Sequence, residues 1–100
     1  MSNTDLIIAA IKNLNKLKVS YDGGKRLIEP YILYEDSKGE VLLNAYQTLG
    51  YSSTGQPAQW KNFNLSEISV IEPFRDKFQP RSDYNPSTNK YKNIIAKVSG

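Results

Sequence analysis

Turn-forming residues divide residues 17–72 into five short segments, and this spacing constrains the fold more than any other feature of the sequence. Asp22-Gly23-Gly24 tolerates positive φ and fits a tight hairpin, and Glu35-Asp36-Ser37-Lys38-Gly39 predicts a second turn. The segments between the turns carry apolar residues with a period of two, as strands do. Five short strands with tight connections are typical of a small closed barrel or a sandwich.

The expected strands cover about residues 17–21, 25–34, 40–49, 58–64 and 68–72. Pro30 has no N–H to donate to a ladder, so the second strand is expected to lie at an edge or to carry a bulge near this residue. In the third strand, Leu43 and Ala45 are expected to face inward, and Asn44 and Thr48 outward.

The two ends of the chain predict different structures. Residues 3–16 read as a helix, because its apolar residues recur at helical spacing and Ser2 and Asp5 match a capping box. The stripe comprises Leu6, Ile7, Ala10, Ile11, Leu14 and Leu17. Residues 73–100 form a basic extension, in which Asn85-Pro86 predicts the start of a short final helix. The β-branched residues within 91–98 leave a strand as the alternative. We therefore expect one domain, with a helix (1–16), a β-barrel (17–72) and a helical or irregular tail.

Composition excludes several classes of function. The chain has no cysteine and no histidine, which removes disulfides, thiolate chemistry and the usual acid–base and metal-binding side chain. No glycine-rich phosphate loop or metal-ligand cluster is present, so we expect no enzyme activity, no cofactor and no bound metal. No apolar run reaches membrane-spanning length, and the N-terminus lacks a signal peptide's basic start. A cytoplasmic protein is the expectation.

The net charge of +3 is unevenly distributed. Residues 1–21 carry three lysines and one carboxylate, and residues 73–100 carry six cationic side chains and two carboxylates. Residues 22–72, in contrast, carry four cationic side chains and seven carboxylates. A basic end can attract phosphates, and the alternative is a solvated lysine-rich surface.

Four strings occur in a suggestive order. They are Val19-Ser20-Tyr21 before the Asp-Gly turn, Arg26-Leu27-Ile28-Glu29-Pro30-Tyr31-Ile32-Leu33, Ala45-Tyr46, and Lys61-Asn62-Phe63-Asn64-Leu65-Ser66-Glu67-Ile68. Together with Ala10-Ile11 in the leading helix, they resemble the WYL domain, a bacterial module with an Sm- or SH3-like barrel. The family's Trp-Tyr-Leu falls on Val41-Leu42-Leu43, where only the leucine is kept. Two family arginines fall on Asn64 and Glu67.

The resemblance implies a mainly β (α+β) fold with a five-stranded Sm/SH3-like barrel. It also implies regulatory ligand sensing, often of nucleotides or nucleic acid, in transcription regulation. Such modules commonly follow a helix-turn-helix domain. Only some 16 residues precede the expected barrel, so we expect a module that stands alone or works with a separate protein.

Four strand residues are the candidate ligand site. Arg26 and Lys61 would neutralise an anionic ligand, and Tyr46 and Trp60 would offer stacking surfaces to a nucleotide or a short single strand of nucleic acid. The alternatives are a cross-strand ion pair of Arg26 with Glu29 or a neighbour, and ordinary core packing of the aromatic rings.

Arg75, Lys77 and Arg81 are candidate phosphate contacts in the C-terminal extension. The alternative is that these charges are solvated while neighbouring phenylalanines dock the tail. The sequence thus favours a non-enzymatic module that binds an anionic ligand. A protein-interaction module that uses a barrel groove or a strand edge is the second hypothesis.

Overall fold

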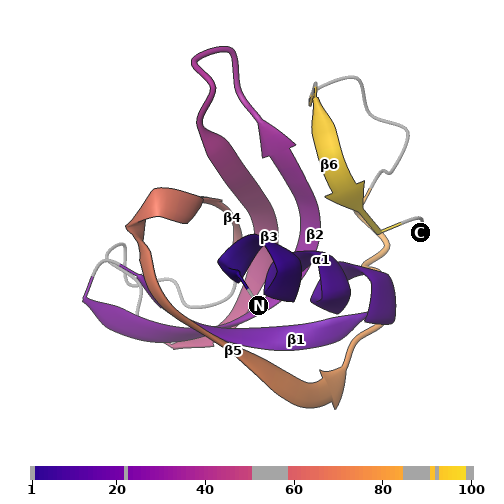
Figure 1. Ribbon diagram of the computed structural model, residues 1–100. Helices are drawn as coiled ribbons and strands as arrows, with labels where there is room; N and C mark the ends of the chain where they lie inside the picture. The colour runs from indigo at the N-terminus through magenta and orange to yellow at the C-terminus, as the bar shows by residue number, and fades with distance from the viewer. Residues whose placement is uncertain (1, 22, 51–58, 85–90, 92, 99–100) are drawn as a thin grey trace.

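The computed structural model describes residues 2–21, 23–50, 59–84, 91 and 93–98 (Figure 1). Within these residues the chain forms one helix followed by a six-stranded antiparallel sheet, which confirms a mainly β, α+β class. The elements are α1 (Asn3–Asn13), β1 (Asn15–Tyr21), β2 (Gly24–Glu35), β3 (Val41–Gly50), β4 (Gln59–Asn64), the 3-10 turn η1 (Leu65–Glu67), β5 (Ile68–Lys77) and β6 (Ile94–Lys97).

Helix α1 begins and ends at identifiable caps. The Ser2 hydroxyl accepts a hydrogen bond from the Asp5 N–H at 3.1 Å, as the capping box predicts. The helix ends at Asn13, and its C-cap Leu14 has a left-handed φ of 57°, so α1 stops before the predicted residue 16. Its buried side chains, Ile7, Ala10 and Ile11, belong to the same core as the sheet.

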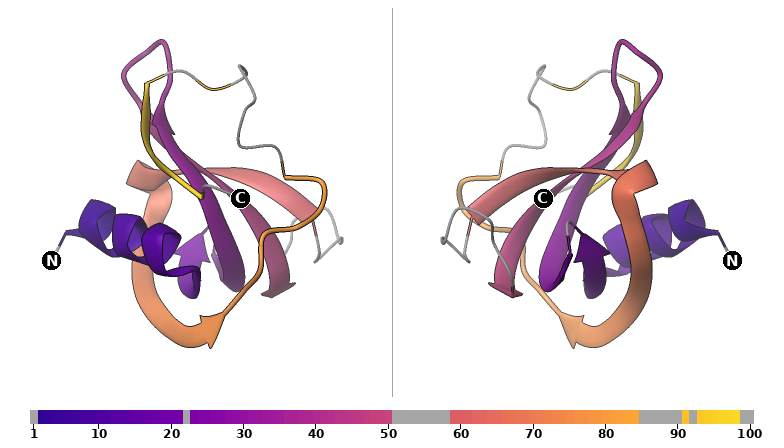
Figure 2. Two further views of the ribbon diagram at one scale, coloured as in Figure 1. Left: turned by 90° about the vertical axis from the view of Figure 1, so that its right-hand side faces the viewer. Right: turned by 90° about the vertical axis from the view of Figure 1, so that its left-hand side faces the viewer.

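The sheet has the strand order β4-β3-β2-β1-β5, and β6 pairs with β2 off this path. β2 is twelve residues long: its first half pairs with β1, while Ile32–Tyr34 pair with β6. β4 and β5 stand at the two ends of the order, and no pairing joins them among the described residues. Side views show the sheet curling strongly, with α1 on one side and the segment after β5 on the other (Figure 2).

Pro30 lies at a bulge, which confirms one of the two alternatives predicted for this residue. The β2–β3 register shifts between Pro30 and Ile32. On the other side of β2, pairing with β1 ends at Ile28 and pairing with β6 begins at Ile32. Pro30, which has no N–H, therefore lies between the part of β2 that pairs with β1 and the part that pairs with β6, so its missing donor breaks neither ladder. The edge-strand alternative is wrong, because β2 has neighbours on both sides.

The C-terminal part of the chain corrects two expectations. β5 continues to Lys77 rather than ending at Glu72, so Phe74 lies in a strand. The predicted final helix is wrong, since residues 94–97 form β6, the sixth strand. Helical spacing and β-branched residues compete in this segment, and pairing with the open edge of β2 favours the strand. Asn85-Pro86, the predicted helix start, lies outside the described residues.

Part of the core lies between α1 and the sheet, and buried residues on the opposite side of the sheet, such as Tyr31 and Phe78, belong to the same cluster. Fully buried side chains of α1 and four strands belong to it, among them Ile7, Ile11, Leu17, Ile28, Leu33, Leu43 and Phe63. Leu43 and Ala45 face inward as predicted. Asn44 was expected to face solvent but is only 8% exposed, because the opposite side of the sheet is covered as well. No helix in the described part of the chain has the length and apolarity to cross a membrane.

Candidate functional site

The four residues predicted to form one ligand site, Arg26, Tyr46, Trp60 and Lys61, are divided between two faces of the sheet. Tyr46 lies opposite Trp60 in the β3–β4 ladder, and their rings meet edge to face at 5.3 Å. Lys61 directly follows Trp60 in β4, so its side chain projects from the other face. Arg26 lies on that face too, because it binds Gln47, the neighbour of Tyr46 in β3. We call the side of Tyr46 and Trp60 the aromatic face and the opposite side the inner face.

On the inner face, Arg26 is part of the protein interior. It is 3% exposed, and its Nη1 donates to Oε1 of the buried Gln47 at 3.2 Å. The guanidinium carbon lies 5.1 Å from the ring centroid of Tyr21 and 5.7 Å from that of Phe63. Two aromatic faces and an amide thus surround this charge, an arrangement that suits a flat guanidinium. A role of Arg26 in ligand binding stays a prediction.

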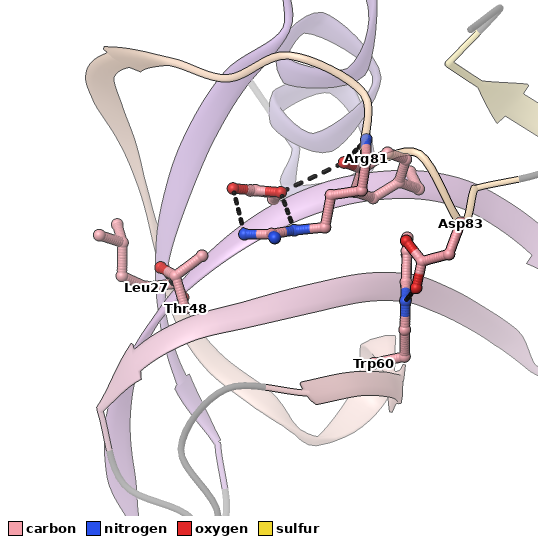
Figure 3. A network of polar contacts seen from close by, with 7 residues as sticks. Leu27, Thr48, Trp60, Arg81 and Asp83 are labelled. Carbon is pink, nitrogen blue, oxygen red and sulfur yellow. Dashed lines mark hydrogen bonds and ion pairs between the residues drawn. The ribbon is translucent and has the colours of Figure 1, made fainter.

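On the aromatic face, Arg81 closes a polar network with β2 (Figure 3). Its Nε and Nη2 donate to the two carboxylate oxygens of Glu29 at 2.9 and 3.2 Å. Its guanidinium carbon lies 3.6 Å from the ring centroid of Tyr46, and its backbone N–H donates to the Tyr31 hydroxyl at 3.0 Å. Arg81, predicted to contact phosphate, is therefore bound to a carboxylate, and Glu29 is paired with Arg81 rather than with Arg26.

Tyr31 is the internal member of this network. Its hydroxyl donates to Oε1 of Glu29 at 3.2 Å while it accepts from the Arg81 N–H. Burial, reinforced by the nearby Glu29 carboxylate, raises the pKa of Tyr31 well above its ordinary value. The phenol therefore keeps its proton, and it acts as a donor to the carboxylate at every physiological pH.

Trp60 is surrounded by other rings and anchors the segment after β5. Its ring centroid lies 4.8 Å from that of Tyr31 and 6.4 Å from that of Tyr84, and its Nε1 donates to Oδ2 of Asp83 at 2.7 Å (Figure 3). Phe78, 7% exposed, packs on Tyr31 at 5.2 Å. The residues from Phe78 to Tyr84 therefore cover the aromatic face, and Trp60 contributes to that packing.

Exposed cations gather on the far side of the sheet, where the two basic ends of the chain meet. β1 pairs with β5 so that Asn15 lies opposite Lys77 and Lys18 opposite Glu72. Two lysines of the N-terminal part thereby lie beside the cations of β5. We call Lys16, Lys18, Lys25, Arg75 and Lys77 the basic edge; all are exposed except the half-buried Lys16. β1 and β5 together carry four of these cations and two carboxylates, Glu72 and Asp76.

One hollow lies at the basic edge, and a second borders it at Arg75. A small cavity of about 110 Å³ is lined by Lys18, Ser20, Lys25 and Glu72, together with two valines. A larger groove of about 450 Å³ runs between α1 and β5, and its lining includes Asn13, Asn15, Phe74 and Arg75. The Lys18 ammonium lies 5.8 Å from the centroid of the half-buried Phe74 ring. A cation that lines the cavity thus lies near a partly exposed aromatic ring that lines the groove.

The sequence analysis missed the carboxylate and the tyrosines that complete the aromatic face. Glu29, Tyr31 and Tyr84 were not proposed as site residues, although Glu29 stands in an otherwise apolar stretch of β2. A carboxylate in a buried strand needs a cationic partner, and that was the available signal. The sequence offered Arg26 as the partner because it is close in the chain, whereas Arg81 lies 52 residues away.

Within the described residues, no group of three or more carboxylates gathers to hold a metal ion. A scan against protein-family models, a search of curated proteins and a search of solved structures each give no significant match.

Proposed function

We propose that the chain is a cytoplasmic, non-enzymatic binding module of the WYL type that takes an anionic, nucleotide-like ligand or a short single strand of nucleic acid. The fold proposed with it is a small Sm/SH3-like barrel, in which β1 to β5 wrap the core and β6 is an addition. The strand order β4-β3-β2-β1-β5 and the leading helix support this assignment. The motifs shared with WYL domains support a role in transcription regulation.

The observation that carries the proposal is the meeting of the two basic ends at the basic edge. The β1–β5 ladder holds Lys18, Arg75 and Lys77 within one stretch of sheet, although they lie far apart in the sequence. Cations that neighbouring strands hold close together attract a chain of phosphates, and this attraction acts over roughly the Debye length. The partly exposed ring of Phe74 offers a stacking surface between them.

This location differs from the one expected from sequence. Arg26 and Lys61 lie on the inner face, and the aromatic face holds two carboxylates, Glu29 and Asp83. The buried Glu29 carboxylate repels phosphate and already holds the Arg81 guanidinium, so the aromatic face is the less suitable surface for an anion. We therefore assign the anionic ligand to the basic edge and keep Arg75 and Lys77 as phosphate contacts.

The test is a salt titration with a matched control. The triple variant Lys18→Gln/Arg75→Gln/Lys77→Gln should lose about tenfold or more in affinity for a fluorescent single-stranded oligonucleotide at low salt. The slope of log K against log salt should fall by about 2, because each lost contact to a single strand removes roughly 0.7. Lys38→Gln, in the exposed β2–β3 turn on the other side of the molecule, should bind like wild type. Equal affinity of the triple variant and Lys38→Gln would overturn the assignment.

A protein-interaction module is the second candidate, and one observation favours it. β6 exposes Ile94 and Ile95, which are 37% and 45% accessible, and in the described residues it pairs with β2 alone. A partner strand could add to that free edge. Such binding would be weakened by Ile95→Lys and would respond little to salt, in contrast to binding at the basic edge.

A further inference from the structure

Arg81 is held on the aromatic face as a ligand is held in a site. The carboxylate of Glu29 receives two parallel N–H bonds, at 2.9 and 3.2 Å, and the Tyr46 ring lies 3.6 Å from the guanidinium carbon. The Glu29 side chain is 6% exposed, whereas that of Arg81 is 36% exposed. The receptor is thus buried, and its occupant remains open to solvent.

The receptor and its occupant come from different parts of the fold. Glu29 and Tyr46 face each other in the β2–β3 ladder, at the centre of the sheet, where neighbouring strands fix the backbone. Tyr31 holds Glu29 in place through a hydrogen bond. Arg81, in contrast, lies between β5 and β6 in a segment without helix or strand. The site is therefore built by rigid elements and filled by an irregular one.

The chemistry of the receptor selects a guanidinium. Two carboxylate oxygens match the planar fork of an arginine, and a lysine ammonium cannot make both bonds while stacking on the ring. We propose that Glu29 and Tyr46, supported by Tyr31, form a guanidinium-binding site that Arg81 fills in cis and that the guanidinium of another molecule can fill in trans. The source is an arginine side chain of a partner protein or a small guanidine compound.

Competition with Arg81 sets the expected strength of binding. Release of Arg81 breaks both of its bonds to Glu29, so the open site is rarely populated and an incoming guanidinium must exchange with Arg81. Arg81 is tethered to the same chain, so it competes at a high effective concentration. Removal of Arg81 should therefore strengthen binding in trans by about tenfold or more.

The test compares wild type with Arg81→Ala. Two probes are titrated, Nα-acetyl-arginine amide and a short peptide with one central arginine, and the fluorescence of Trp60 and the melting temperature are recorded. Both probes should give saturable binding to Arg81→Ala and weaker, still saturable binding to wild type. The same probes with lysine or citrulline in place of arginine should not bind, and Glu29→Gln/Arg81→Ala should bind none of them. Tighter binding of the peptide than of the amide assigns the site to a protein partner, and equal binding assigns it to a small guanidine.

Two outcomes would overturn the proposal. The first is the absence of saturable arginine binding to Arg81→Ala. The second is binding to Arg81→Ala with none to wild type at a hundredfold higher probe concentration, which would make Arg81 a structural residue only. If Arg81→Ala does not fold, Arg81→Lys keeps a cation in the segment, and the same comparison applies. Oligonucleotide affinity should be unchanged in Arg81→Ala, so this test is independent of the one at the basic edge.

Discussion

The inner face and the aromatic face each hold one arginine, and the two arginines differ in exposure and in hydrogen-bond partner. Arg26 is 3% exposed, binds a neutral amide and lies between two rings. Arg81 keeps 36% of its side chain exposed, binds a carboxylate and stacks on one ring. The first charge is enclosed by β2 itself and its neighbours, whereas the second arrives on a later segment. The same side chain is thus part of the core in one setting and fastens a covering segment to the sheet in the other.

The largest expected loss of stability tests whether packing on the inner face contributes most to the free energy of unfolding. Phe63 is fully buried beside Arg26, so Phe63→Ala should lower the free energy of unfolding by about 3–5 kcal/mol. Phe74 is half-buried on the basic edge, and Phe74→Ala should cost clearly less. Urea denaturation of both variants measures the difference, and equal losses would contradict this view of the inner face.

An intermediate effect is expected at the charge pair of the aromatic face. Glu29→Gln removes the negative charge but keeps the shape, and we expect a loss of about 1–2 kcal/mol because Arg81 remains partly solvated. The control, Glu72→Gln on the exposed side of β5, should stay within about 0.5 kcal/mol of wild type. Chemical denaturation at neutral pH measures both losses. A Glu29→Gln variant as stable as Glu72→Gln would mean that the pair contributes nothing measurable.

The smallest effect compares the tyrosines of the two faces. Tyr31→Phe loses two hydrogen bonds of a buried hydroxyl, which should cost about 1 kcal/mol at neutral pH. Tyr21→Phe loses one exposed hydrogen bond, to Glu67, and should cost less.

The pH dependence sharpens this comparison. Burial raises the pKa of Tyr31 above the ordinary 10.0 of the unfolded chain, so the folded state holds the proton more tightly. The resulting stability is complete below pH 10 and is lost as the pH rises toward the raised pKa. Between pH 9 and 11, wild type should therefore lose more stability than Tyr31→Phe does. Identical slopes in urea midpoints would contradict the buried position of the phenol.

Local patterns in the sequence predict most of the framework. The capping box of α1, the bulge at Pro30 and the inward positions of Leu43 and Ala45 follow from rules that act over a few residues. The strand at 94–97 does not, because its residues suit a helix as well, and its pairing with β2 decides the outcome.

In the candidate site, too, some features follow from the local sequence and others depend on the tertiary fold. Trp60 and Lys61 are neighbours in a strand, so their separation onto two faces follows from the sequence alone. The pairing of Glu29 with Arg81 does not follow, since the two residues are joined only by the tertiary fold. The meeting of the two basic ends likewise depends on the β1–β5 register, which composition cannot supply.

The late position of β6 has a consequence for how the molecule is made. Ile94 is synthesised 60 residues after Tyr34, the residue it pairs with. Until then, one side of β2 between Ile32 and Tyr34 offers unpaired N–H and C=O groups beside apolar side chains, a template on which nascent chains stick to each other. Closing so long a loop costs little more than closing a short one, so the fold can complete once the last strand emerges. This stretch of β2 therefore stays open to other chains for as long as the residues up to β6 take to be synthesised.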